Sequence, residues 1–111
     1  MKNNCQNLKT NNICELKSKN YCANNKFEKL NVNYLGNNSV DINFQLFKLK
    51  IHCQENIDCN GSIINIIKKD NDCVYKILNK LKINNIKIYY NKNKDYILIK
   101  NSKINLILNK C

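Results

Sequence analysis

Residues 62–83, SIINIIKKDNDCVYKILNKLKI, carry the strongest pattern in the chain and decide the predicted fold class. The isoleucine-rich run at residues 62–67 predicts a buried strand. Apolar side chains then recur at i, i+3, i+4 and i+7, which predicts a helix over residues 71–83. This buried stripe consists of Val74, Ile77, Leu78 and Leu81. Asp70 and Asp72 are candidate N-caps, and Asn84-Asn85 can end the helix in a left-handed conformation.

On the N-terminal side, two alternating stretches predict a β-hairpin. Apolar side chains alternate over residues 30–34 and again over residues 40–46, with the turn sequence GNNS at residues 36–39 between them. The alternation changes phase at residues 47–48, which fits either a β-bulge or a short helix over residues 44–49. The strand pattern resumes at residues 49–53, and QENIDCNG at residues 54–61 is predicted to be a loop.

The C-terminal third predicts three more strands. Residues 86–90, 96–100 and 104–108 alternate in polarity, and short polar turns at residues 91–94 and 101–103 separate them. We therefore expect an α+β fold, in which a small and mostly antiparallel sheet of about five to six strands is packed by one main helix. The helix stripe is expected to pack against Ile64, Ile66, Ile88 and Leu98.

Residues 1–26 differ from the rest because they are rich in Asn and Lys and lack a clear period. We predict that they form an irregular, mobile N-terminal extension that a large partner holds, and that residues 27–111 form a single domain. No apolar signal segment and no run long enough to span a bilayer is expected, which favours a cytoplasmic protein and no membrane partner.

The composition is dominated by Asn, Lys and Ile, which account for 60 of the 111 residues and indicate an AT-rich genome. The formal net charge of +11 attracts polyanions whatever its origin. All the cationic side chains are lysines, since the chain contains no Arg. Bidentate contacts to guanine are then unavailable, which favours phosphate contacts on a structured RNA over the reading of a DNA sequence.

Lysines and aromatic side chains cluster along the predicted elements, a pattern typical of RNA-binding surfaces. Solvated lysines on a sheet surface are the alternative. The predicted RNA-binding residues are Lys48, Lys50, Lys68, Lys69, Lys76, Lys80, Lys82, Lys87, Tyr89, Lys92 and Lys94.

The seven cysteines form no recognisable motif. Their number is odd, so we expect reduced, mostly buried thiols rather than a disulfide framework. No C-x2-4-C knuckle is present, and we expect no metal and no other cofactor. If a metal bound, a cluster including Cys5, Cys14 and Cys22 would be the first candidate.

Nothing in the sequence supports an enzyme. The eight acidic residues form no pair with a spacing that demands acid–base work, and the two glycines make no phosphate loop. His52 adjoins Cys53, but neighbours on a strand point to opposite faces, so they make a poor nucleophile–base pair.

Residues 59–88 resemble the second half of the translation initiation factor one family, in which a C-x-G segment and a strand lead through an Asp-containing turn to a helix. The matching positions are Cys59, Gly61, Ile64, Ile66, Asp70, Val74, Leu78 and Leu81. Lys69 stands where that family usually has a glycine, and no functional residue carries over. The resemblance implies a role in translation.

The sequence thus predicts a non-enzymatic RNA-binding component or bound factor of a large ribonucleoprotein, with the ribosome favoured. Its partners would be rRNA, contacted by lysine at phosphates, and neighbouring ribosomal proteins. Two alternatives stay open: a small protein like a translation initiation factor, or a protein-binding or metal-stapled adaptor that works without RNA.

Overall fold

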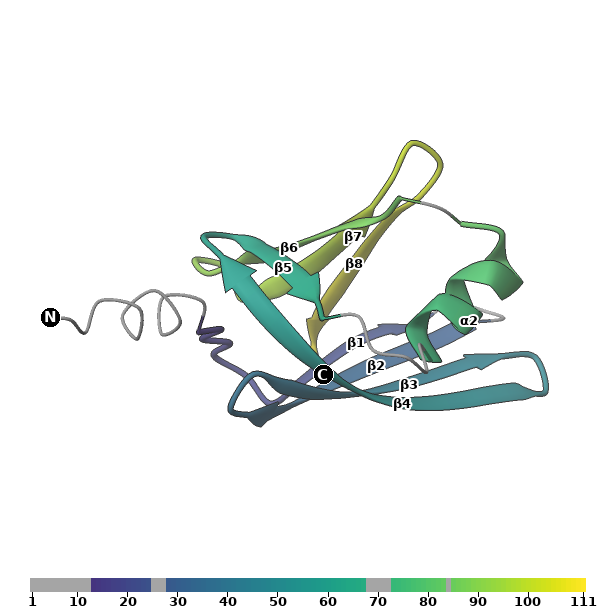
Figure 1. Ribbon diagram of the computed structural model, residues 1–111, viewed down its shortest axis with the longest axis horizontal. Helices are drawn as coiled ribbons and strands as arrows, with labels where there is room; N and C mark the ends of the chain where they lie inside the picture. Colours follow the sequence, from purple (N-terminus) through teal and green to yellow (C-terminus); the bar gives the residue numbers. More distant parts are fainter. Residues whose placement is uncertain (1–12, 25–27, 68–72, 84) are drawn as a thin grey trace, which may run out of the picture.

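The computed structural model describes residues 13–24, 28–67, 73–83 and 85–111, and in these residues eight antiparallel strands form a closed barrel (Figure 1). Each strand pairs with the next one along the chain, and the last pairs back with the first, so that Tyr21 lies opposite Lys110. The predicted α+β fold is therefore wrong: a barrel wall replaces the open sheet, and the helix has only nine residues.

The strands run in chain order around the barrel. They are β1 (Asn20–Asn24), β2 (Glu28–Gly36), β3 (Ser39–Leu46), β4 (Leu49–Asn60), β5 (Ile63–Ile66), β6 (Lys87–Asn91), β7 (Tyr96–Lys100) and β8 (Asn105–Lys110). Helix α2 (Cys73–Leu81) lies between β5 and β6. The barrel includes β1, so it begins inside the stretch that was expected to be an N-terminal extension.

The β2–β3 hairpin is confirmed, because its local signals are strong. Asn37 and Asn38 form its turn with φ angles of 53° and 59°, the left-handed conformation that two-residue hairpin turns require. Val32 pairs with Ile42, and the buried residues of β3 alternate as the pattern predicted. The strands predicted at residues 62–67, 86–90, 96–100 and 104–108 are also confirmed as β5 to β8, with small shifts at their ends.

The interpretation of residues 44–61 is wrong in two places. Phe47 and Lys48 form neither a bulge nor a helix but the turn between β3 and β4, with Leu46 paired to Leu49 and a φ of 54° at Phe47. The predicted loop at residues 54–61 is mostly the second half of β4, which continues to Asn60. Glu55 hid the strand, because it is a charged residue at a buried, inward-facing position and so interrupts the apolar alternation.

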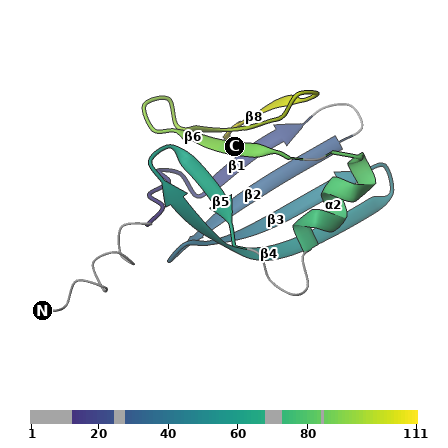
Figure 2. The same cartoon turned by 45° about the horizontal axis from the view of Figure 1, so that its top comes forward.

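β4 is long enough to belong to both halves of the barrel. Its residues 49–56 pair with β3, and its residues 57–60 pair with β5 on the other side. Helix α2 packs against β4, at the end where β5 does not reach it. Figures 1 and 2 show the consequence: α2 fills the side of the barrel where the strand layers β1–β4 and β5–β8 diverge.

Helix α2 ends in a Schellman motif. The Lys82 N–H donates to the carbonyl of Asn79 over 3.1 Å, and the Ile83 N–H donates to the carbonyl of Leu78 over 2.9 Å. Lys82 takes the left-handed conformation, with a φ of 57°, so the predicted cap at residues 84–85 lies too far along the chain. The predicted N-caps at residues 70 and 72 lie outside the described residues.

The predicted helix stripe is confirmed at Val74 and Ile77, which are buried, while Leu78 is half-buried. The side chain of Leu81 lies outside the described part. Leu98 is not in the core, since its neighbour Ile97 is the β7 residue that faces inward. Tyr21 and Leu108 are the most completely buried large side chains among those described.

Six of the cysteines form three disulfides, which corrects the expectation of reduced thiols. Cys14 joins Cys59, Cys22 joins Cys111, and Cys53 joins Cys73, with Cα–Cα distances of 5.1, 5.3 and 5.7 Å. The sequence alone could not show these pairs, because their separations of 45, 89 and 20 residues follow no known motif.

Candidate functional site: an apolar cavity in the barrel

The barrel encloses a cavity of about 740 Å³. Eight strands give an interior that side chains can either fill or leave open for one small ligand. A volume of this size falls within the range of about 300–1,000 Å³ that is usual for small-molecule sites. The interior of this barrel is therefore large enough to hold a ligand.

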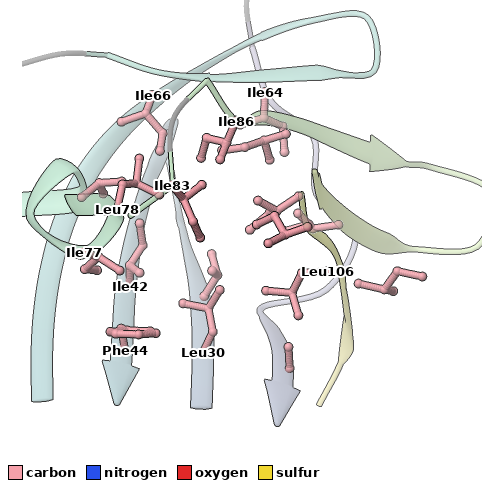
Figure 3. A pocket seen from close by; sticks show the side chains of 18 of the residues that line it. Leu30, Ile42, Phe44, Ile64, Ile66, Ile77, Leu78, Ile83, Ile86 and Leu106 are labelled. Atoms are coloured by element: carbon pink, nitrogen blue, oxygen red, sulfur yellow. The ribbon is translucent and has the colours of Figure 1, made fainter. Parts of the chain in front are cut away.

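The cavity wall is almost wholly apolar. Figure 3 shows its side chains converging from β2, β3, β5, β8 and α2, with carbon at every atom drawn. Branched aliphatic residues and Phe44 supply most of this surface. Such a lining favours a ligand that is mostly apolar, since polar side chains occur in it only at Lys82, Lys103 and Asn105 among the described residues.

Several side chains that line the cavity are only half-buried although they belong to the packed interior of the barrel. They include Leu30, Val32, Ile66, Leu78, Ile88, Ile99 and Leu106. Protein interiors normally pack to the density of organic crystals, so this much unfilled apolar surface is unusual in a core. These side chains would lose more of their contact with water, and so gain further hydrophobic free energy, if an apolar molecule filled the space.

One end of the barrel is closed by the segment at residues 13–19, which lies opposite α2 in Figure 1. The Cys14 N–H donates to Asn38 Oδ1 over 2.8 Å, and the Tyr34 hydroxyl donates to the Cys14 carbonyl over 2.6 Å. The disulfide from Cys14 to Cys59 ties the same segment to the end of β4. The segment is thus fixed across this end at several points.

A buried polar network completes this closed end. Asp95 is 8% exposed and accepts hydrogen bonds from the hydroxyls of Tyr21 and Tyr90, both at 2.6 Å. The Ser18 hydroxyl donates to the other carboxylate oxygen. The rings of Tyr21 and Tyr90 meet edge to face, with their centroids 6.1 Å apart.

The network holds Asp95 in its ionised form. Burial alone would raise the pKa of this carboxyl, but hydrogen bonds from Ser18, Tyr21 and Tyr90 outweigh it and lower the pKa below its usual value. Burial and the bond to Asp95 raise the pKa of Tyr21 and of Tyr90. At neutral pH the Asp95 carboxyl is therefore ionised and both tyrosine hydroxyls keep their protons.

The opposite end of the barrel is where the cavity reaches the surface. Helix α2, the residues after it and the β7–β8 turn line the cavity there. Lys82 and Lys103 line the cavity and are also exposed, so the cavity opens to solvent beside them. The disulfide from Cys53 to Cys73 fixes the first turn of α2 to β4, which makes this helix a tethered lid.

The predicted RNA-binding residues are not brought together on one surface. Most lie at the α2 end and are exposed: Lys48 in the β3–β4 turn, Lys50 at the start of β4, Lys76 and Lys80 on α2, Lys82 after α2, and Lys87 at the start of β6. Lys92 and Lys94 lie in the β6–β7 turn at the closed end of the barrel. Tyr89 is half-buried with the Lys100 ammonium 5.5 Å from its ring centre, while Lys68 and Lys69 lie outside the described residues.

The structure also bears on the residues that the sequence suggested for catalysis or metal binding. His52 Nε2 lies 3.4 Å from Asp41 Oδ1 on the neighbouring strand, and Cys53 is in a disulfide, so they make no nucleophile–base pair. Cys14 and Cys22 belong to two different disulfides and are not free as metal ligands; Cys5 lies outside the described part. No group of three or more potential metal ligands occurs among the described side chains.

Sequence reasoning missed the cavity and the closed end. The inward-facing residues did show as alternating apolar positions, but alternation does not distinguish a packed sheet from a hollow barrel. Tyr21 and Asp95 carry no motif, and the hydrogen bonds that join Asp95 to Tyr21 and to Ser18 span 74 and 77 residues. The sequence did offer one signal for the closed end: Tyr21 is a large aromatic residue in an otherwise polar stretch.

Comparison with protein-family models, with curated proteins and with solved structures finds no match to the chain. No family model therefore supports the resemblance of residues 59–88 to the translation initiation factor one family. In the part of the chain that the structure describes, no helix is long and apolar enough to cross a membrane.

Proposed function

We propose that the protein binds one small apolar ligand inside the barrel. The observation that carries this proposal is the cavity of about 740 Å³ with a nearly continuous aliphatic lining. Three further features support it: a fixed closed end, a tethered helix at the open end, and interior side chains that are left half-buried. A rigid wall with one opening is the usual arrangement of a preformed ligand site.

The test is a titration of the purified protein with N-phenylnaphthylamine, a neutral probe whose fluorescence rises in apolar surroundings. We expect saturation at one probe per chain. Val32→Phe fills part of the cavity from β2 and should weaken probe binding by at least about tenfold, or 1.4 kcal/mol. Asn43→Phe adds the same ring on the exposed side of β3 and should leave probe binding unchanged.

Probe binding that does not saturate, or that Val32→Phe leaves intact in a folded protein, would overturn the proposal. Thermal melting of both variants checks that they fold.

RNA binding is the second candidate, and one observation favours it. Six of the predicted lysines are exposed at the α2 end of the barrel, and the net charge is +11. We propose that an RNA partner would be held there through its phosphates. This partner would be rRNA if the protein belongs to a ribosome. Affinity for RNA should then fall steeply between about 50 and 200 mM salt. Binding that is insensitive to salt, or absent at low salt, would exclude it.

The two proposed functions, ligand binding and RNA binding, fit different cellular compartments. A ribosomal or translation-linked role requires the cytoplasmic location that the sequence predicted. Disulfides persist in oxidising compartments and are rare in the cytosol, so the three disulfides favour an oxidising location and the ligand-binding proposal. Rapid alkylation of thiols in intact cells, followed by mass analysis, would report whether the six cysteines are paired in the native setting.

A further inference from the structure

The charged side chains on the cavity wall are all positive and all lie at one end of the barrel. Among the described residues that line the cavity, Lys82 and Lys103 are the charged ones, and Asn105 is the uncharged polar side chain beside them. All three lie at the α2 end, where the cavity reaches the surface. Neither lysine forms an ion pair with a described acidic side chain.

The backbone holds both lysines in fixed positions at the opening. Lys82 is the left-handed residue of the Schellman motif, and the next residue, Ile83, lines the cavity with Leu78. Lys103 sits in the β7–β8 turn, where Asn101 Oδ1 accepts hydrogen bonds from the Lys103 and Ile104 N–H groups at 2.7 and 2.8 Å. Their side chains therefore start from defined points while their ammonium groups remain in water.

The far end of the cavity offers nothing comparable. There the Asp95 carboxylate is already bonded to Ser18, Tyr21 and Tyr90, and none of these four residues lines the cavity. A polar group on the buried end of a ligand would lose its hydrogen bonds to water without replacement. A ligand can therefore carry a polar group only at the end that lies in the opening, and there two cations favour a negative one.

We propose that the ligand of this cavity is a long-chain carboxylate, bound with its hydrocarbon chain inside the barrel and its carboxylate between Lys82 and Lys103. This inference rests on the proposed ligand-binding function and names the ligand class. A lysine ammonium is a compact point charge that pairs with a carboxylate in partly hydrated surroundings, as the exposure of both side chains requires. A lipid with a phosphate headgroup shares the anionic chemistry, and the test separates the two.

The test measures how palmitate, hexadecanol and a lysophosphatidic acid of the same chain length displace bound N-phenylnaphthylamine. Palmitate and hexadecanol have equal chains and differ in the charge of the head. We expect palmitate to displace the probe at a concentration about threefold to tenfold lower than hexadecanol, since two solvent-exposed ion pairs each contribute modestly. We also expect palmitate to bind more tightly than the phosphate lipid.

Lys82→Met with Lys103→Met keeps the length of both side chains and removes their charges. This double variant should bring palmitate to the level of hexadecanol when both lipids are compared in the same variant. Lys92→Met with Lys94→Met removes two charges at the closed end of the barrel and should preserve the preference for palmitate. This control separates a local contact from the general effect of the net charge.

Equal displacement by palmitate and hexadecanol in the unmodified protein would overturn the inference, and so would a preference that survives the Lys82/Lys103 double variant. Tighter binding of the phosphate lipid would replace the carboxylate by a phosphate. In each of these cases the probe still binds, so the proposed function stands. Absence of saturable probe binding would remove the proposed function and this inference together.

Discussion

The Tyr21 hydroxyl donates to Asp95 Oδ1 over 2.6 Å and thereby joins the first strand of the barrel to the β6–β7 turn, 74 residues further along the chain. Both residues are buried, with 0% and 8% of their surface exposed. A buried carboxylate is costly unless its oxygens are satisfied, and here three hydroxyl groups satisfy them. The pair therefore fixes the closed end of the barrel, and with it the depth of the cavity.

Replacing Asp95 with Asn should destabilise the protein at neutral pH. The change removes the negative charge that three hydroxyls solvate, and it puts an amide donor where only acceptors fit, which costs about 1–3 kcal/mol. Unfolding in urea at pH 7 measures this loss. Asp41→Asn, at a half-buried position facing His52 across β3 and β4, should cost less than about 1 kcal/mol.

The same carboxylate should make the protein sensitive to acid. The pKa of Asp95 is lower in the folded state than its usual value of 3.8, so its contribution to stability is complete above that pH. The contribution is lost as the pH falls below 3.8 and through the folded-state pKa, because the folded state resists protonation. The difference in stability between the native chain and Asp95→Asn should therefore shrink in acid, and a constant difference down to pH 2 would contradict this role.

The hairpins could be predicted from sequence because their signals are local. Asn37-Asn38 and Gly61 mark turns, and the flanking residues alternate with a period of two, so β2, β3 and β5 to β8 are all found close to where the pattern places them. Helix α2 was found for the same reason, since its stripe at Val74 and Ile77 has helical spacing.

Closure of the barrel could not be predicted, because it depends on contacts between the two ends of the chain. β1 meets β8 through the pairs Tyr21–Lys110 and Cys22–Asn109, and neither sequence stretch shows that the other is its partner. The cavity follows from closure, so it was missed as well. Lys82 was identified by its charge, but an exposed lysine has the same appearance in the sequence whether it meets RNA, a ligand or water.

Replacing Leu108 with Ala should cost about 2–5 kcal/mol of stability. Leu108 is completely buried in the barrel, so the change removes packed methyl groups and leaves a void. Leu35→Ala is the matched control, because Leu35 is 49% exposed on β2 and its truncation should shift the stability by less than about 0.5 kcal/mol. Similar losses for both variants would contradict the inward orientation of Leu108.

Alkylation of the oxidised protein under denaturing conditions should modify one cysteine per chain. Six of the seven cysteines are paired, which leaves Cys5 as the odd one in the sequence. Mass analysis before and after reduction counts the thiols, and peptide mapping should recover Cys14 with Cys59, Cys22 with Cys111 and Cys53 with Cys73. Three or more reactive thiols without reduction would mean that at least one disulfide is absent.

Removing the disulfide between Cys53 and Cys73 should loosen the lid more than the barrel. The double change to Ala frees α2 from β4, where the disulfide is its covalent tie, while the strand pairs of β3 with β4 remain. On a chain-entropy account, a bridge across 20 residues is worth about 3 kcal/mol and one across 45 residues about 4 kcal/mol. Global stability should thus fall less than when Cys14 and Cys59 are both changed to Ala.

Hydrogen exchange distinguishes the two effects. In the Cys53/Cys73 variant we expect the amides of α2 to exchange faster than those of β3, because local opening of the helix no longer needs the barrel to unfold. A neutral probe bound in the cavity should also leave faster, since α2 lines the opening. In the Cys14/Cys59 variant, whose bridge lies at the opposite end, the ratio of α2 exchange to β3 exchange should stay as in the native chain. An unchanged ratio in the Cys53/Cys73 variant would show that packing alone holds the helix in place.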